Sequence, residues 1–419
     1  IKKCIRNGVG GIKTKSYSPL LPIRHCYYPT FSFFDFLGSE YKSVFGVGSL
    51  GYPRSPERVI EKEMPEIRRL CNEAELPLIA SIFATSDVET CAKLARDFYE
   101  AGADAIEFCA SCPVCDMPKW QVLVKKAGLT EEQGKFGYAV LRNSELTSKL
   151  IKETTRRLQE VKKEVAAPLF LKLHVFLEPY EVYIRNYLEA GVDGFACHDG
   201  LGTVAVIDVE RESQPFCCWP TGGSTGPGSG LRYVSLGKIV RLKLAFPNVY
   251  VSGIGGIANA NHALQYMLAG CSTVELFTAV CYYGHGIFSR IIEGIKSWME
   301  RKGYSTVKEF VGNALRSYGV SVQPPAMPGL HPEDDTLPYA PSVNLGKCNF
   351  CGICQDRCLY DTIEVDKARK AINIRENECW NCGICVAVCP TNAISLVDKN
   401  TKELVWNNTM GQAKPHRPT

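Results

Sequence analysis

The sequence predicts an α/β protein whose larger part is a (β/α)8 barrel, the TIM-barrel fold. Seven short β-rich runs alternate with helical stretches over residues 1 to about 305, and a glycine or proline precedes each run. A doubly wound sheet is the alternative, but it lacks the support of an early Gly-x-Gly-x-x-Gly and a central switch point. The expected strands are residues 11–16, 78–83, 105–110, 169–175, 194–198, 249–253 and 273–279.

Helices are expected between these runs, and the start of the chain points to an eighth strand. Residues 1–7 continue a helix that Gly8-Val9-Gly10-Gly11 closes, so the first barrel strand is expected to precede Ile1. The expected helices are residues 56–75, 86–101, 143–165, 178–190, 231–246, 259–269 and 284–302.

Four segments are expected along the chain. The barrel occupies residues 1–320, and a Pro-rich, semi-extended linker follows over residues 321–343. A small α+β domain is expected over residues 344–397, and residues 398–419 form a polar tail with little order.

Composition excludes several classes of protein. The 419 residues are 45% hydrophobic and 22% charged, which is typical of a soluble globular chain, and no apolar run is long enough to span a bilayer. A formal charge of +4, dispersed along the chain, argues against nucleic acid. The 20 cysteines cluster in metal-ligand spacings, which favours a reducing, cytoplasmic location and redox or metal cysteines.

Eight cysteines of the small domain form two runs with the spacing of bacterial ferredoxins. In two-cluster ferredoxins the fourth cysteine of each run ligates the other cluster, so Cys389 would join the first run and Cys358 the second. Two [4Fe-4S] clusters are therefore predicted, and with them the transfer of single electrons. A pair of zinc knuckles is the alternative, although zinc does not require two symmetric four-cysteine runs. The runs are Cys348-x-x-Cys351-x-x-Cys354-x-x-x-Cys358 and Cys379-x-x-Cys382-x-x-Cys385-x-x-x-Cys389.

Two lysines and a cysteine mark the C-terminal ends of the expected strands, where the active sites of such barrels lie. Lys15 and Cys112 follow strands, whereas Lys172 lies inside the apolar run of residues 169–173. A lysine inside an apolar strand is costly unless it meets an anion or an acceptor. The alternative is a lysine that extends its charged end to solvent.

Glycine-rich turns near the last strands are candidates for binding phosphate. Free backbone N–H groups in such turns bind anions, and Gly255 and Gly256 let the backbone approach closely. Taken alone, the run Gly253-Ile254-Gly255-Gly256 could be a plain tight turn. In the loop after the seventh strand of a barrel, it stands where phosphate commonly binds.

At several strand ends the chain resembles the dihydroorotate dehydrogenase family, in the branch of dihydropyrimidine dehydrogenase, where an FMN barrel precedes a two-cluster ferredoxin domain. The resemblance covers residues 1 to about 397 and rests on the order and spacing of six motifs. They are Thr14-Lys15-Ser16, Ser111-Cys112-Pro113, Phe170-Leu171-Lys172-Leu173, Gly222-Gly223-Ser224-Thr225-Gly226, Gly253-Ile254-Gly255-Gly256-Ile257 and Phe277-Thr278-Ala279.

The resemblance implies a bound FMN and a role for Cys112. In the family, the matching cysteine exchanges a proton with one carbon of a C–C bond while the neighbouring carbon exchanges hydride with FMN. Lys172 would meet the negative charge near N1 and O2 of the reduced flavin. The alternative for Cys112 is a small buried hydrophobe. The FMN contacts implied are Lys15, Lys172, Gly223, Ser224, Gly255, Gly256, Phe277 and Thr278.

The substrate motif departs from the family pattern. The family's Asn-x-Ser-Cys-Pro-Asn is replaced by residues 109–114, which read Cys-Ala-Ser-Cys-Pro-Val, and its asparagine after the sixth strand falls on Asp199. Because the amides that pair with a pyrimidine ring are missing, we expect a substrate other than a pyrimidine. The candidate substrate-binding residues are Cys109, Ser111, His198 and Asp199.

Three interpretations of Cys109, Cys112 and Cys115 remain open. They are small wall residues around one working thiol, or Cys112 and a neighbour form a reactive dithiol, or all three bind a metal or a third cluster with one further cysteine. Cys197 and the pair at 217–218 lie in the same part of the barrel. In the third case Cys112 could not also donate a proton.

Together these features predict a flavin- and iron–sulfur-dependent oxidoreductase that acts on a C–C or C=C bond of a small substrate. No NAD or FAD fingerprint is visible, so a partner subunit is expected to supply that site and the protein is expected to form a hetero-oligomer. The rival hypothesis is an electron-transfer subunit of a larger complex, in which the barrel is a relay or a scaffold.

Overall fold

The computed structural model describes residues 1–18, 31–35, 44–48, 55–112, 124–125, 128, 130–161, 167–200, 212, 230–319 and 339–408. The chain forms two compact units, Ile1–Gly319 and Val320–Thr419. Among the described residues, no helix has the length and apolar content needed to cross a membrane.

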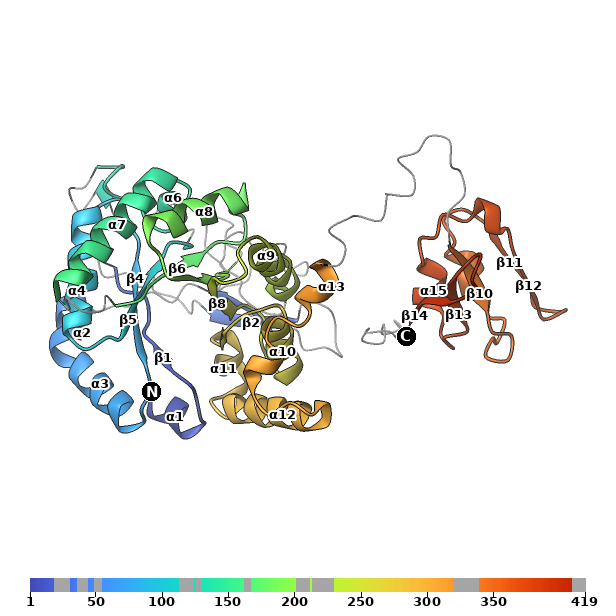
Figure 1. Ribbon diagram of the computed structural model, residues 1–419, viewed down its shortest axis with the longest axis horizontal. Coiled ribbons are helices and arrows are strands. Elements are labelled where there is room, and N and C mark those ends of the chain that lie inside the picture. The colour runs from blue at the N-terminus through green and yellow to red at the C-terminus, as the bar shows by residue number, and fades with distance from the viewer. Residues whose placement is uncertain are drawn as a thin grey trace. The chain divides into compact units, whose positions relative to one another are not determined.

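The larger unit is built on a curled parallel sheet of seven strands (Figure 1), and each strand pairs with the next one along the sheet. The predicted barrel-type fold is confirmed, and the doubly wound alternative fails because the strand order never reverses. Strands β1 and β9 form the two edges of the described sheet. The strands are β1 (Ile12–Lys13), β4 (Leu78–Phe83), β5 (Ala105–Cys109), β6 (Leu169–Leu173), β7 (Gly194–Cys197), β8 (Tyr250–Ile254) and β9 (Thr273–Glu275).

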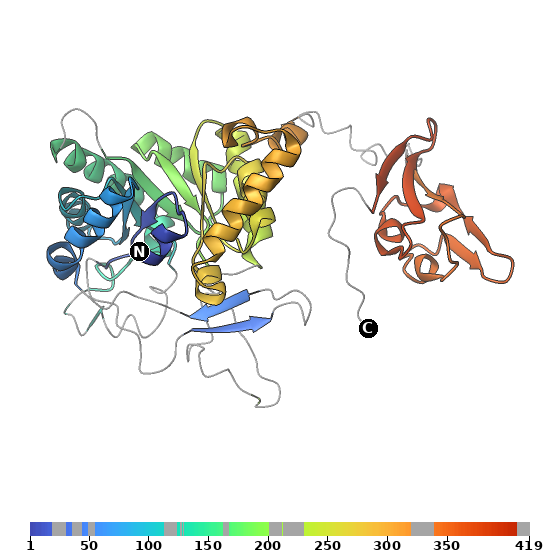
Figure 2. The same ribbon diagram turned by 90° about the horizontal axis from the view of Figure 1, so that it is seen from below.

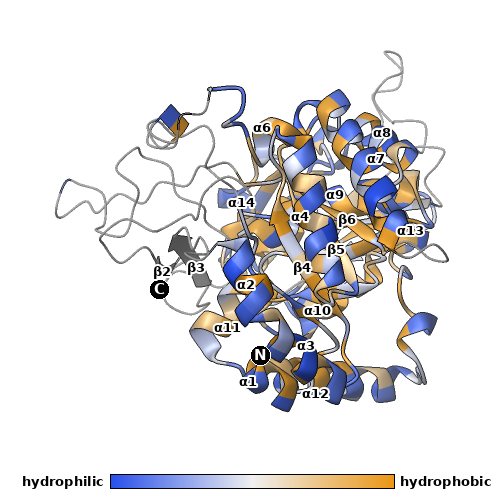
Figure 3. Ribbon diagram, turned by 90° about the vertical axis from the view of Figure 1, so that its left-hand side faces the viewer, coloured by the Kyte–Doolittle hydropathy of each residue, from blue (hydrophilic) through white to orange (hydrophobic). Residues whose placement is uncertain are grey.

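Helices cover the outside of this sheet (Figures 1 and 2), as a barrel requires. Figure 3 shows hydrophilic colours on the solvent-facing turns of the helices and hydrophobic colours toward the sheet. The helices are α1 (Lys2–Arg6), α2 (Pro56–Lys62), α3 (Met64–Glu73), α4 (Val88–Glu100), α6 (Tyr138–Leu141), α7 (Ser144–Val161), α8 (Tyr180–Ala190), α9 (Leu231–Ala245), α10 (Ala260–Leu268), α11 (Thr278–Tyr283), α12 (Ile287–Lys302), η2 (Val307–Glu309) and α13 (Leu315–Gly319).

Two features of this unit differ from the sequence expectation. The helix expected over residues 56–75 is two helices. The first ends at Lys62, Glu63 separates them, and Pro65 lies in the first turn of α3, a position that proline favours. A hairpin of β2 (Phe31–Asp35) and β3 (Val44–Gly48) was not expected. It lies beside α11 (Figure 2), the helix that follows the C-terminal end of β9, so it flanks the end of the barrel that carries the candidate site.

The smaller unit combines short strands, helical turns and two loops rich in cysteine. Its three-stranded antiparallel sheet has the order β10, β13, β14, and β11 pairs with β12. Two of its strands lie outside residues 344–397: β10 falls in the expected linker and β14 in the expected tail. Its elements are β10 (Tyr339–Val343), α14 (Ile353–Asp356), β11 (Ile363–Asp366), β12 (Ala371–Ile374), η3 (Glu376–Glu378), α15 (Ile384–Val388), β13 (Ile394–Asp398) and β14 (Leu404–Asn407).

Candidate active site and iron–sulfur sites

The C-terminal ends of the barrel strands bring together side chains from four parts of the chain. Lys15 follows β1, Lys172 lies in β6, and Asp199 follows β7, where the N–H of Asp199 donates to the carbonyl of Leu173. In the β5–β6 register Cys109 stands opposite Lys172. Because parallel strands end at one edge of a sheet, residues far apart in sequence share this mouth.

Asp199 is the most strongly held carboxylate at the mouth. Ser111 Oγ donates to Asp199 Oδ2 at 2.7 Å, the N–H of Gly200 donates to Oδ1 at 2.9 Å, and Cys109 Sγ lies 3.8 Å from Oδ2. Burial raises the pKa of Asp199, but Lys172, these donors and Lys15 outweigh it and hold the pKa below its usual value. The side chain is therefore an ionised acceptor, whereas an asparagine in its place would also donate.

Lys172 meets the anion that its place in an apolar strand required. Its Nζ lies 3.1 Å from Oε1 of Glu107, which is completely buried in β5. Burial alone lowers the pKa of a lysine, but Glu107 raises that of Lys172 well above its usual value, with smaller contributions from Cys109 and Asp199. Lys172 is therefore a permanent cation near the mouth. Glu107 was not predicted, although a glutamate in an apolar strand is the same signal as the lysine.

Lys15 is a second cation of the mouth. Surrounding protein lowers the pKa of Lys15, Lys172 lowers it further, and Asp199 partly opposes them. The side chain nevertheless stays open to solvent, and its Nζ lies 5.3 Å from the centre of the Phe277 ring. Phe277 is half exposed and Thr278 is buried at the start of α11. An accessible cation beside an exposed ring suits an anionic, aromatic group.

The backbone around Cys112 is held in place by a close approach. The Cys112 carbonyl accepts a hydrogen bond from the N–H of Tyr138 at 3.0 Å, and a Cβ on Gly137 would lie 2.2 Å from that oxygen. Gly137 also has φ = 59°, so only glycine fits there. Cys112 itself is half-buried. The backbone of Cys112, three residues past the end of β5, is therefore held in place.

Cys109 is less suited to chemistry than Cys112. It is buried, and burial together with Asp199 raises the pKa of its thiol. It is thus held as a neutral thiol beside Ser111 and Asp199. Cys115 and the pair at 217–218, on which a third cluster depends, lie outside the described residues.

His198 is not brought to the mouth. Its ring lies 2.8 Å from the Tyr180 hydroxyl and 3.0 Å from Ser235 Oγ, residues of helices α8 and α9 on the outside of the sheet. Burial, with Lys238 and His174, lowers the pKa of His198 to about 3. The sequence expectation placed it beside Asp199, but it lies one residue past β7, where strand alternation no longer applies.

A pH-dependent stability follows from His198. The native state keeps the ring neutral down to about pH 3, whereas the unfolded chain binds a proton below about pH 6.5. The neutral His198 ring therefore makes its full contribution to the free energy of unfolding above pH 6.5, and this contribution is lost as the pH falls toward 3. Between pH 7.5 and 5.5 the free energy of unfolding of the wild-type protein should fall by roughly 1 kcal/mol more than that of a His198→Gln variant. Urea unfolding at both pH values measures this difference, and equal losses would contradict it.

The glycine loop after β8 has the shape that close approach to a phosphate needs. Gly255 and Gly256 have φ = 109° and 68°, and a Cβ on Gly255 would lie 2.8 Å from Leu231 Cδ2. A side chain at Gly255 would therefore strain the backbone and collide with α9. This loop and the two cations of the mouth fit an anionic flavin nucleotide. Gly223 and Ser224, also expected to contact it, lie outside the described residues.

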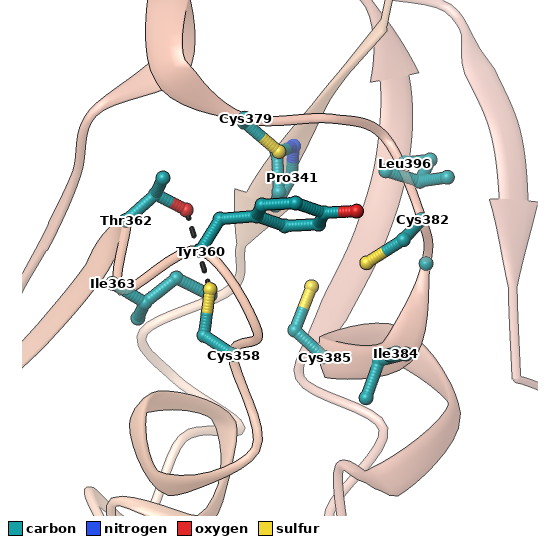
Figure 4. A pocket seen from close by; sticks show the side chains of 11 residues that line it. Pro341, Cys358, Tyr360, Thr362, Ile363, Cys379, Cys382, Ile384, Cys385 and Leu396 are labelled. Atoms are coloured by element: carbon teal, nitrogen blue, oxygen red, sulfur yellow. Dashed lines mark hydrogen bonds between the residues drawn. The ribbon is translucent and has the colours of Figure 1, made fainter.

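One group of four cysteines lines a small pocket in the smaller unit. Figure 4 shows Cys379, Cys382 and Cys385 from the second run together with Cys358 from the first. Thr362 Oγ1 lies 3.4 Å from Cys358 Sγ, and the Tyr360 ring extends along the cavity (Figure 4). This is the crossed set that the spacing predicts.

The remaining four cysteines are those of the predicted second set, Cys348, Cys351, Cys354 and Cys389. Backbone N–H groups already point at two of these sulfurs: Phe350 N lies 3.3 Å from Cys348 Sγ, and Ala393 N lies 3.2 Å from Cys389 Sγ. Such N–H···S bonds tune clusters. Within the described part of the chain, no three His, Cys, Asp or Glu side chains converge as ligands of one metal ion.

Comparison with known proteins finds a family model for a part of each compact unit. A family model described as dihydroorotate dehydrogenase matches residues 46–299. The chain belongs to the dihydroorotate dehydrogenase family. A second model, described as a 4Fe-4S dicluster domain, matches residues 347–393. Members of this family are oxidoreductases acting on CH–CH groups, and this chain is a flavin- and iron–sulfur-dependent enzyme of that kind.

Three relatives match different shares of this chain. The NAD-dependent dihydropyrimidine dehydrogenase subunit PreA of Escherichia coli (strain K12) is 24% identical over 380 residues, 88% of this chain and 83% of the relative. The catalytic subunit of dihydroorotate dehydrogenase B (NAD(+)) of Pyrococcus abyssi is 27% identical over 317 residues, 75% and 90% of the two chains. That of Thermococcus kodakarensis is 30% identical over 241 residues, 58% and 69%.

Proposed function

We propose that this enzyme oxidises or reduces a C–C bond of a small substrate other than a pyrimidine, and that electrons pass through two [4Fe-4S] clusters to or from a partner subunit. The observation that carries this proposal is the charged group at the strand ends. Lys172 and Lys15 stand as cations beside Asp199, which Ser111 holds at 2.7 Å. An ionised carboxylate replaces the amide of the family pattern at the point where substrate recognition is expected.

In this proposal, FMN supplies hydride exchange when it is bound at the mouth. Lys172 presents a fixed positive charge, and Lys15 with Phe277 provides a cation and a ring at the other side. The backbone of Gly255 and Gly256 approaches the phosphate without a side chain between them. The remaining proposed contacts with FMN come from Thr278, Gly223 and Ser224.

Cys112 is the proposed general acid or base. The residue is half-buried just past the end of β5, and its backbone is held by the hydrogen bond from Tyr138, so its thiol could hold the proton exchanged with one substrate carbon. General acid–base catalysis contributes about 10²- to 10⁴-fold to a rate. Cys109, buried and held as a thiol, forms part of the wall.

The substrate is selected by Asp199 and Ser111 in this proposal. Because the Asp199 carboxylate only accepts hydrogen bonds, a substrate must present an N–H or O–H donor to it. A pyrimidine whose ring oxygen or nitrogen accepts a hydrogen bond from an amide would face the Asp199 carboxylate, which cannot donate. The acceptor on the ring would stay unpaired, and this lowers the affinity. His198 takes no part, since it is bound by Tyr180 and Ser235.

The partner in this proposal carries an NAD- or FAD-binding site and forms a hetero-oligomer with this chain in the cytoplasm. No dinucleotide fingerprint occurs in the sequence. The relative PreA is by its name a subunit of an NAD-dependent dehydrogenase, which favours such an arrangement. The clusters of the smaller unit then connect the flavin with the partner.

Cofactor content and turnover of the purified protein test this function. We expect one FMN and about eight iron atoms per chain, which are those of the two ferredoxin clusters. Dihydrouracil and dihydroorotate are both expected to be inert with electron acceptor present. Turnover of either would refute the proposed substrate, and absence of flavin would refute the flavin site. About twelve iron atoms would instead place a third cluster at Cys109, Cys112 and Cys115.

A further inference from the structure

Four charged side chains form a connected row inside the barrel, which we call the ion row. It consists of Glu275 in β9, Lys13 in β1, Glu107 in β5 and Lys172 in β6. Lys13 Nζ lies 2.5 Å from Glu275 Oε1 and also pairs with Glu107 Oε2, while Lys172 Nζ lies 3.1 Å from Glu107 Oε1. The two oxygens of Glu107 are therefore divided between two lysines.

The ion row is shielded from solvent and satisfied by hydroxyl groups. The Glu107 side chain is 1% exposed, and those of Lys172, Lys13 and Glu275 are 14%, 17% and 24% exposed. Ser81 Oγ donates to Glu107 at 3.2 Å, and Ser252 Oγ donates to Glu275 at 2.6 Å. Buried charges are tolerated when they are paired and hydrogen-bonded, and here two positive and two negative charges balance.

The charges of the row depend on one another. Burial lowers the pKa of Lys13, but Glu107 and Glu275 outweigh it and raise that pKa above its usual value. Burial raises the pKa of Glu107, but Lys13 and Lys172 hold it below its usual value. Lys13, Glu107 and Lys172 are thus charged at neutral pH. Removing one member changes both the net charge and the share of Glu107 that each lysine receives.

We propose that Lys13 is a positioning residue that sets how much positive charge Lys172 presents to the flavin. This inference rests on the proposed function, in which Lys172 faces FMN. Without Lys13, both oxygens of Glu107 act on Lys172 and the row carries a net charge of −1. Without the charge of Glu275, Lys13 offsets more of Glu107 and the row carries +1. Because reduced flavin is more negative than oxidised flavin, the first change disfavours reduction and the second favours it.

The test is the two-electron midpoint potential of FMN bound to the full-length protein. Lys13→Met should shift the balance of reduced to oxidised flavin about tenfold toward the oxidised form, a potential about 30 mV lower. Glu275→Gln should raise the potential by a smaller amount, because Glu275 is the row member farthest along from Lys172. The double variant Lys13→Met/Glu275→Gln, which removes a neutral pair, should return close to the wild-type potential.

Shifts of the flavin potential in opposite directions in the two single variants distinguish this role from a structural one. A variant that merely loosens the barrel lowers stability but does not raise the potential in one case and lower it in the other. Lys296→Met is the matched control, because Lys296 is exposed and pairs with Glu293 on the outer surface. It should leave the potential unchanged.

Each result decides the proposal. Shifts of the same sign, or no shift while FMN stays bound, would overturn the role of Lys13. If Lys13→Met fails to fold or to hold flavin, Glu275→Gln alone decides, and a potential that does not rise overturns the proposal. A wild-type protein without FMN would instead refute the proposed function on which the inference rests.

Discussion

Two double cysteine variants of the smaller unit are expected to differ completely in iron content. Cys358→Ser/Cys379→Ser should keep about four iron atoms per chain, whereas Cys354→Ser/Cys358→Ser should keep none. The reason is the grouping in Figure 4, where the Cys358 sulfur lies with those of Cys379, Cys382 and Cys385. The first variant loses two ligands of one cluster, and the second loses one ligand of each. Iron analysis and visible absorbance of the anaerobically purified proteins measure this.

The reverse result would show that each run holds its own cluster. In that case Cys358→Ser/Cys379→Ser would lose all iron and Cys354→Ser/Cys358→Ser would keep half of it. Cys4→Ser, at a half-buried cysteine of α1, is the control and should keep about eight iron atoms. The pair of variants therefore distinguishes the two ligand patterns without knowledge of the substrate or the partner.

Replacement of Lys172 by methionine is expected to have the largest effect on the flavin. The variant removes the fixed cation that Glu107 holds at 3.1 Å, so reduced FMN loses its main electrostatic support. The ratio of reduced to oxidised flavin should fall about a hundredfold or more, which corresponds to a midpoint potential about 60 mV lower. The barrel should still fold, because Glu107 keeps its pair with Lys13. A redox titration of the bound flavin measures the shift.

The two ferredoxin clusters provide an internal control for this variant. Their iron content should match that of the wild-type protein, since Lys172 belongs to the larger compact unit and the cluster cysteines to the smaller one. An unchanged flavin potential in Lys172→Met would contradict the proposed place of Lys172. It would leave Lys172 with only its buried ion pair to Glu107, which is a structural role.

Much of the fold could be predicted because its signals are local. Each of the seven expected runs became a strand of the parallel sheet, since short apolar runs bounded by glycine or proline are typical of buried parallel strands. The strands β10 and β14 were missed for a different reason. Pro341 in β10 and the polar residues around β14 do not indicate strands, and both are edge strands that depend on β13 between them. Trp406 of β14 also packs over Gly383, a contact that no local pattern reveals.

The candidate site was predictable in part. Lys15 and Lys172 were found because each stands at or near the end of an expected strand, and Asp199 because the family's asparagine falls on it. The structure brings the three together. His198 was misplaced, because the residue after a strand no longer follows the alternation of that strand. Glu107 and Lys13 were overlooked, although each is a charged residue in a short β-rich run.

The sequence by itself determined the chemistry available to this protein: eight cysteines with cluster spacing, a lysine in an apolar strand and a glycine turn at a strand end. These are local properties, since a ligand loop or a costly buried charge is visible within a few residues. Only the tertiary structure decided which charges act together. Lys13, Glu107, Lys172 and Glu275 come from four strands, and the parallel register with the curl of the sheet places them in one row. Because charge interactions depend on distance in space and on burial, the sequence could name the lysine but not the carboxylates that control it.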